Sequence, residues 1–147
     1  MTSLYAWLKF LHLVGLAIFL FGHGVAAGNA LALRARPGAA VSRALLNLSI
    51  RSYALAYPGL LILIVTGAWM GFLGSFWRSG WIWTAVAILV VLFVVMAALS
   101  VPYHQARDAK EDGVLDSTLG RARPIVISLV GAFALLALIF LMVFKPW

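Results

Sequence analysis

Four long apolar runs restrict what this chain can fold into. They cover residues 4–33, 53–72, 82–101 and 125–144. A helix of about 20 apolar residues spans the hydrocarbon core of a bilayer. A chain inside lipid must also satisfy its backbone hydrogen bonds internally. The sequence therefore predicts an all-α protein, a single domain built as a four-helix transmembrane bundle.

The charged residues support this prediction and indicate an orientation. Only 10% of residues are charged and 65% are hydrophobic, whereas about 25% are charged in soluble domains. Eight of the eleven Lys and Arg residues lie in two linkers, 34–52 and 102–124. Positive linkers face the cytoplasm, so we expect an up-down-up-down bundle with both termini outside a bacterial inner membrane. The basic residues are thus orientation signals, and no nucleic-acid partner is expected.

The linkers carry local signals of their own. Residues 41–52 read as an amphipathic helix lying at the membrane interface before Pro58. Residues 105–112 read as a polar extension of the third helix that ends at Gly113. Asp116 or Ser117 could then cap the fourth helix.

Small and aromatic residues predict how the helices meet each other and the membrane. Gly24 and Gly28, and likewise Gly67 and Gly71, form GxxxG motifs that allow close helix packing, within the chain or in a homodimer. A belt of aromatic residues is expected at the outer boundary. It comprises Trp7, Trp77, Trp81, Trp83 and Trp147.

Histidines inside the apolar runs are the main functional candidates, because ionisable groups in membrane helices are usually functional. His12 and His23 share one helix face, about 16 Å apart along the axis. Helix rise places His12 about 10 Å outside the membrane centre and His23 about 7 Å inside it. His104 falls at the cytoplasmic edge, about 19 Å from the centre. No two histidines share a level, which disfavours a bis-histidine haem within one chain.

Two methionines do share the expected level of His12. Met70 and Met142 each lie about 11 Å outside the centre. One imidazole with thioethers could ligate haem or Cu(I). Methionine is also a common filler of apolar cores, and His12 could instead bond a backbone carbonyl or Thr84.

The inner histidine has weaker candidates around it. Met96 lies near the depth of His23, and Tyr57 could donate a hydrogen bond to it. Packing is the expected role of His23, and an ordinary interfacial position is expected for His104.

Several function classes are excluded by what the sequence lacks. There is no cysteine, so disulfides, iron–sulfur clusters and thiolate metal sites are ruled out. The apolar runs contain no carboxylate, which argues against a proton-coupled transporter of the usual kind.

Short motifs add a family resemblance. Trp7-Leu-Lys-Phe-Leu-His12 resembles the opening helix of HemJ-type protoporphyrinogen oxidases and of CopD-like copper-resistance membrane proteins. Tyr57-Pro58, Tyr103-His104 and the lysine–proline–aromatic end at 145–147 are similar too. The best match is a family of small four-helix bacterial membrane proteins of unassigned function that resembles both groups.

The resemblance implies one haem b ligated by His12. HemJ-type proteins also carry a lysine early in the third helix, where this chain has Ala85, so the resemblance implies haem binding more strongly than oxidase activity. The leading hypothesis is a haem b-binding redox protein. The alternatives are a Cu(I)-handling protein that uses His12, Met70 and Met142, and a cofactor-free accessory subunit of a larger membrane complex.

Overall fold

The computed structural model describes residues 2–146, which form helices and their connections without a strand in that range. Four long helices make up the bundle, with a 3₁₀ turn and a short helix in two of the connections. In chain order the elements are α1 (Thr2–Leu33), α2 (Ala39–Leu73), η1 (Phe76–Arg78), α3 (Gly80–Asp108), α4 (Asp112–Leu119) and α5 (Pro124–Phe144).

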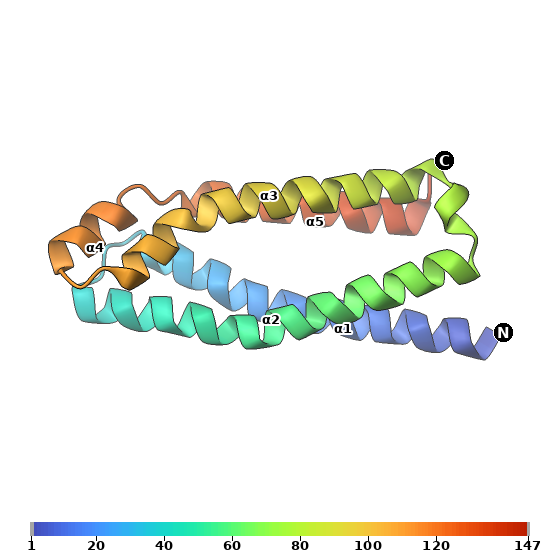
Figure 1. Ribbon diagram of the computed structural model, residues 1–147, viewed down its shortest axis with the longest axis horizontal. Coiled ribbons are helices and arrows are strands. Elements are labelled where there is room, and N and C mark those ends of the chain that lie inside the picture. Colours follow the sequence, from blue (N-terminus) through green and yellow to red (C-terminus); the bar gives the residue numbers. More distant parts are fainter. Residues whose placement is uncertain (1, 147) are drawn as a thin grey trace.

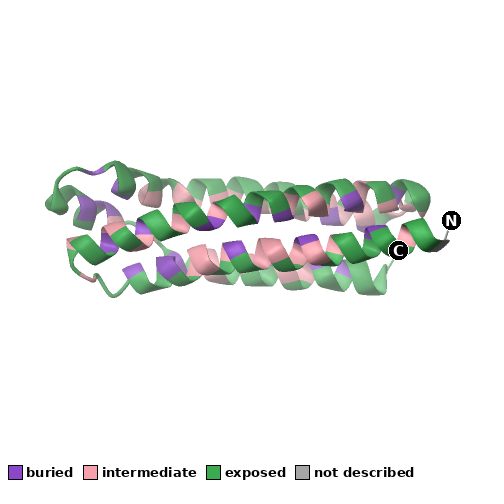
Figure 2. Ribbon diagram, turned by 90° about the horizontal axis from the view of Figure 1, so that it is seen from below, coloured by how far each residue is buried: buried purple, intermediate pink, exposed green. Residues whose placement is uncertain are grey.

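The four long helices run up, down, up and down, as predicted. All four are long and apolar enough to cross a membrane. Both chain ends and η1 lie at one end of the bundle, and α4 lies at the other (Figure 1). The outer faces of the helices are largely exposed (Figure 2), and they carry large apolar side chains such as Phe133, which is 78% exposed. Such a surface is suited to lipid.

The closest packing in the bundle joins α1 to α2. Glycines allow the two backbones to approach. A Cβ atom on Gly59 would lie 2.9 Å from the carbonyl oxygen of Gly15, and one on Gly22 would lie 2.7 Å from the carbonyl oxygen of Ser52. Any side chain at these positions would push the helices apart. Contacts between this pair and the α3–α5 pair are far fewer.

These close contacts do not use the predicted GxxxG motifs. Gly24 and Gly28 are exposed, and a Cβ atom on either would meet nothing within 4 Å. Gly67 faces the ring of His12, and Gly71 faces the indole of Trp77. The expectation that the first motif packs within the chain is therefore wrong, and a homodimer through it stays a prediction.

The prediction of a separate interfacial helix at residues 41–52 is also wrong. That segment is the first part of α2, which continues through Pro58 to Leu73. Proline removes one helical hydrogen bond and favours a bend, and α2 changes direction midway along its length (Figure 1). Packing against α1 on both sides of Pro58, at Ala56 and Gly59, holds the two halves together.

The connection between α3 and α5 differs from the prediction in a similar way. Helix α3 ends at Asp108, and Gly113, Asp116 and Ser117 lie inside α4 rather than ending one helix and capping the next. The short helix forms because it buries Leu115 completely in an apolar cluster. The cluster contains Leu33, Leu46, Ala106, Ala109 and Leu115.

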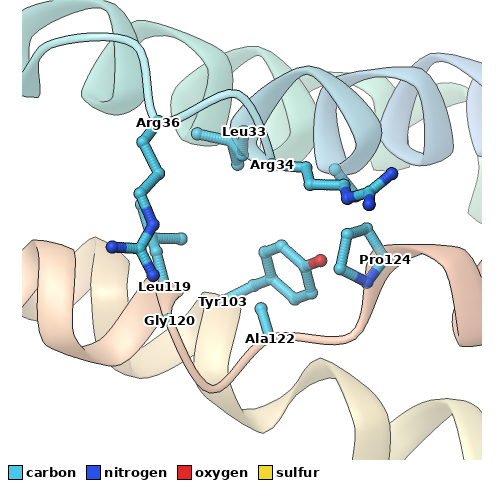
Figure 3. A pocket seen from close by; sticks show the side chains of 9 residues that line it. Leu33, Arg34, Arg36, Tyr103, Leu119, Gly120, Ala122 and Pro124 are labelled. Atoms are coloured by element: carbon cyan, nitrogen blue, oxygen red, sulfur yellow. The ribbon is translucent and has the colours of Figure 1, made fainter.

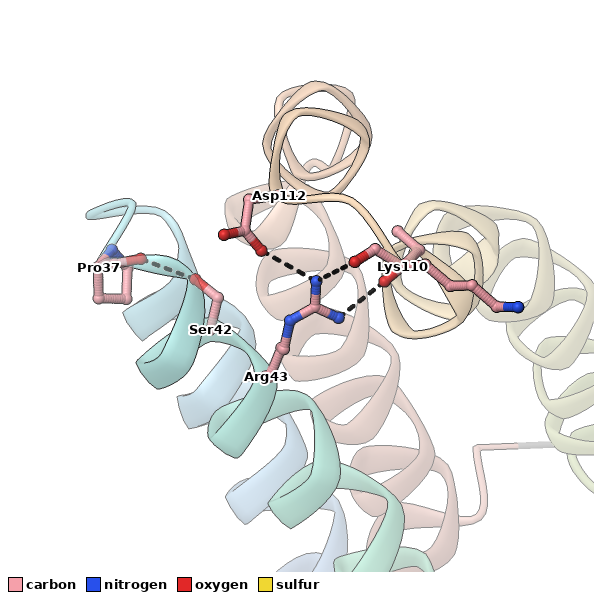
Figure 4. A network of polar contacts seen from close by, with 6 residues as sticks. Pro37, Ser42, Arg43, Lys110 and Asp112 are labelled. Atoms are coloured by element: carbon pink, nitrogen blue, oxygen red, sulfur yellow. Dashed lines mark hydrogen bonds and ion pairs between the residues drawn. The ribbon is translucent and has the colours of Figure 1, made fainter.

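Arg43 links α2 to the α3–α4 connection at the α4 end of the bundle. Arg43 of α2 donates hydrogen bonds to the carbonyl oxygens of Ala109 and Lys110, at 2.7 and 3.1 Å, and pairs with Asp112 at 3.0 Å (Figure 4). The start of α2 is thereby tied to the α3–α4 connection.

Aromatic residues gather at the opposite end. Trp7 and Trp83 are exposed, as a membrane-boundary belt requires, but Trp81 is only 7% exposed. It packs with Ala85, Leu138 and Leu141 between α3 and α5. The predicted belt member Trp147 lies outside the described residues.

Candidate functional site

The side chain of His12 projects from α1 towards α2 and is hydrogen-bonded there to Thr66. The Nδ1 atom of His12 lies 3.0 Å from the Thr66 hydroxyl oxygen. Thr66 donates its own proton to the carbonyl oxygen of Ile62. When the single hydroxyl proton goes to Ile62, the Thr66 oxygen accepts from His12, and Nδ1 carries the imidazole proton. In that tautomer Nε2 carries the lone pair, and the backbone of Leu63 is a second hydrogen-bonding neighbour of the ring.

The side-chain partner of His12 is Thr66 rather than the expected Thr84. Thr84 donates its hydroxyl proton to the carbonyl oxygen of Gly80 in its own helix. Thr66 is the one Ser or Thr in residues 54–72. A lone hydroxyl in the middle of an apolar helix indicated that Thr66 could bond to a neighbouring helix. Pairing it with His12 also required the register of α1 against α2.

Register also places Met70 relative to His12. Three facing pairs keep one antiparallel register along α1 and α2: His12 with Thr66, Gly22 with Ala56, and Asn29 with Ser49. In this register Met70 faces Leu8, about 6 Å further towards the outer end than His12. Met70 is half-buried. It lies about one helical turn from the level that the sequence predicted for it.

His23 lies at a meeting point of three helices. Its ring stacks on Phe19 with centroids 5.3 Å apart. A Cβ atom on Gly131 of α5 would lie 4.0 Å from Nε2 of His23 and 3.0 Å from Cε of Met96 on α3. The depth match of His23 with Met96 is thus confirmed. Tyr57 is 62% exposed, and the structure shows no hydrogen bond from it to His23 within the described chain.

The same meeting point sets the level of Ala85 and Met142. His12 lies eleven residues outward from His23 on α1. Ala85 lies eleven residues outward from Met96 on α3, and Met142 lies eleven residues outward from Gly131 on α5. Each step is about 16 Å along the helix. These three therefore share a layer, as expected. Their side chains do not converge, however: Met142 is 42% exposed, and Ala85 is 4% exposed among the α5 leucines.

The remaining histidine is remote from this layer. His104 is exposed near the end of α3 beside α4. Within the described residues, no three His, Cys, Asp or Glu side chains gather in a way that could hold a metal ion.

We next tested whether the residues present fit a haem. Metal-bound histidines commonly use one ring nitrogen as ligand while the other donates a hydrogen bond that fixes the tautomer. His12 has this pattern, with Nδ1 bonded to Thr66. A Cβ atom on Gly67 would lie 3.1 Å from Cε1 of His12, so glycine there leaves room for the ring. The donor chemistry of His12 would suit a haem held through Nε2.

Comparison with known proteins identifies the family. A family model described as "Predicted integral membrane protein (DUF2269)" matches residues 6–146. The chain belongs to this family. No curated protein and no solved structure matches it. The match covers all four spans, so the chain is an integral membrane protein.

Proposed function

We propose that this protein binds haem b in the membrane, and that Nε2 of His12 would hold its iron. The observation that carries the proposal is the His12–Thr66 hydrogen bond. With the imidazole proton on Nδ1, this bond would leave Nε2 as a lone-pair donor inside an apolar helix. An ionisable imidazole within a membrane span is a functional candidate by default, and ligation would give its second ring nitrogen a role.

Haem is favoured over Cu(I) by the positions of the methionines. A Cu(I) site needs soft ligands that converge. Met142 is 42% exposed on α5, and register puts Met70 a turn away from His12. A haem would need only one strong protein ligand, which His12 could supply.

The residues around His12 would have distinct tasks in such a site. Thr66 would orient the imidazole, Gly67 would leave room for the ring, and the flanking apolar helices would exclude water. Bound haem supplies one-electron redox chemistry. We propose electron transfer rather than protoporphyrinogen oxidation, because the position of the HemJ-type lysine is Ala85, packed against Leu138 and Leu141.

An absorption spectrum of the detergent-purified chain tests the proposal. Protein expressed with haem available should show a Soret band that is lost in His12→Ala. His104→Ala is the matched control, because it removes an exposed imidazole from the same chain and should leave the band unchanged. A wild-type sample without a Soret band, or a band that survives in His12→Ala, would overturn the proposal.

The same sample distinguishes the alternatives. Copper bound at a stoichiometric level, and lost in His12→Ala, would favour a Cu(I)-handling protein. A stable partner that co-purifies without haem or copper would favour an accessory subunit.

A further inference from the structure

A small pocket lies at the α4 end of the bundle, away from His12. Its volume is about 110 Å³, and it opens between the ends of α1 and α3 and the start of α5 (Figure 3). The lining residues are Ala30, Leu33, Arg34, Arg36, Tyr103, Leu119, Gly120, Ala122 and Pro124.

The charge in this pocket is entirely positive. Arg34 and Arg36 line it and no carboxylate does. The ion pairs among residues 2–146 involve Arg43 and Arg107, not these two arginines. Helix α5 begins at the pocket with Pro124, and the amino end of a helix carries partial positive charge. The pocket thus favours an anion.

A hydroxyl group in the pocket points to the same ligand class. The ring of Tyr103 projects between the two arginines (Figure 3). Its hydroxyl oxygen is buried and has no hydrogen-bond partner within the described residues. Buried polar groups are nearly always bonded, so this hydroxyl is a donor in need of an acceptor.

The backbone is also arranged to present Arg36. This residue has a φ of 48°, in the left-handed region that non-glycine residues rarely adopt. Its side chain crosses to α4, where a Cβ atom on Gly120 would lie 3.3 Å from Nη2 of Arg36.

Size and depth identify the anion. A water molecule occupies about 30 Å³ of liquid, so the pocket accommodates a group the size of a phosphate. It lies where the apolar parts of α1 and α5 end, at the level of lipid headgroups. Ala30, Leu33 and Leu119 provide an apolar wall beside the arginines. We propose that this pocket binds the phosphate of an anionic phospholipid.

Lipid titration of the intact chain by native mass spectrometry tests this proposal. Wild-type protein in detergent should bind phosphatidylglycerol more tightly than phosphatidylcholine. The double variant Arg34→Gln/Arg36→Gln should weaken phosphatidylglycerol binding about thirtyfold, because each basic residue contributes about 1 kcal/mol at a membrane surface. Tyr103→Phe should weaken it about tenfold through loss of one bond to a charged group. The hydroxyl it removes has no partner within residues 2–146, so this variant also tests the proposal if the arginine variant does not fold.

The matched control is Arg107→Gln/Arg121→Gln, which removes the same charge at the same end of the bundle from residues outside the pocket. It should retain wild-type affinity. Equal wild-type affinity for the two lipids would overturn the proposal, as would equal losses in the two double variants or full binding in Tyr103→Phe. Displacement of the lipid by inorganic phosphate at matched concentration would overturn the lipid as the source and assign the pocket to free phosphate.

Discussion

At the scale of single residues, the pair of His12 and Thr66 is the most informative feature of the molecule. Each polar group on its own would be costly within an apolar helix. In the pair, Nδ1 of the histidine is hydrogen-bonded to the threonine hydroxyl. The same hydroxyl donates to the carbonyl oxygen of Ile62. The pairing lowers the cost of placing both groups in the span, and with the proton on Nδ1 the lone pair lies on Nε2.

Substitution of Thr66 by valine tests this pairing. Valine keeps the shape but removes the acceptor for His12, and such bonds between membrane helices contribute about 1 kcal/mol. Thr66→Val should lower the free energy of unfolding in detergent by that amount. If haem is bound, it should also reduce haem affinity by about 10–100-fold. Thr84→Val is the control, because that hydroxyl bonds only within its own helix. Equal effects of the two substitutions would contradict the role given to Thr66.

The sequence predicts the depth of a site residue in the membrane better than the direction in which its side chain points. Helix rise predicted the shared layer of His12, Ala85 and Met142, but it misplaced Met70 by one turn, because the register of α2 against α1 is set by packing. The rotation of each helix follows from packing that no short motif encodes. Met142 therefore turned out to be 42% exposed, and the Arg36–Tyr103 pocket, which combines two distant linkers, could not be predicted.

At the scale of the helices, α1 and α2 behave as one unit. Their glycine contacts bring the backbones together along the membrane span, whereas the α3–α5 pair meets them mainly at the His23 level and at the α4 end. The GxxxG pattern failed as a predictor because it does not specify which face of a helix meets a neighbour. Gly15 and Gly22, seven residues apart, lie on the face that does.

Paired glycine substitutions measure this difference. A Cβ atom in Gly59→Ala would lie 2.5 Å from the backbone nitrogen of Phe19, so α1 must move. We expect a loss of about 1–3 kcal/mol in the free energy of unfolding. Gly24→Ala meets open space and should be neutral or stabilising by up to about 1 kcal/mol, because alanine favours helix. Thermal unfolding in detergent, followed by tryptophan fluorescence, would measure both. A stable Gly59→Ala would contradict the close packing.

At the scale of the whole molecule, Arg43 closes the α4 end by joining α2 to the α3–α4 connection. Arg43→Ala removes bonds to two carbonyl oxygens and to Asp112. Because its side chain is 36% exposed, we expect a modest loss of about 1–2 kcal/mol. Hydrogen exchange should increase in α4 and leave the aromatic end unchanged. Arg107→Ala, whose pair is the adjacent Asp108, is the control and should change exchange little. Unchanged exchange in Arg43→Ala would show that the apolar cluster alone holds α4.

The orientation of the whole bundle in the membrane is the last expectation that a direct measurement can decide. The chain has no cysteine, so single cysteines can be introduced without background. Ser3→Cys at the end shared by both termini and Ser117→Cys in α4 replace exposed residues at opposite ends. The positive-inside rule predicts that an impermeant maleimide added to intact cells labels Ser3→Cys alone. Labelling of Ser117→Cys alone would invert the bundle and move the Arg34–Arg36 pocket to the outer leaflet. Labelling of both from one side would contradict a bundle that places them at opposite ends.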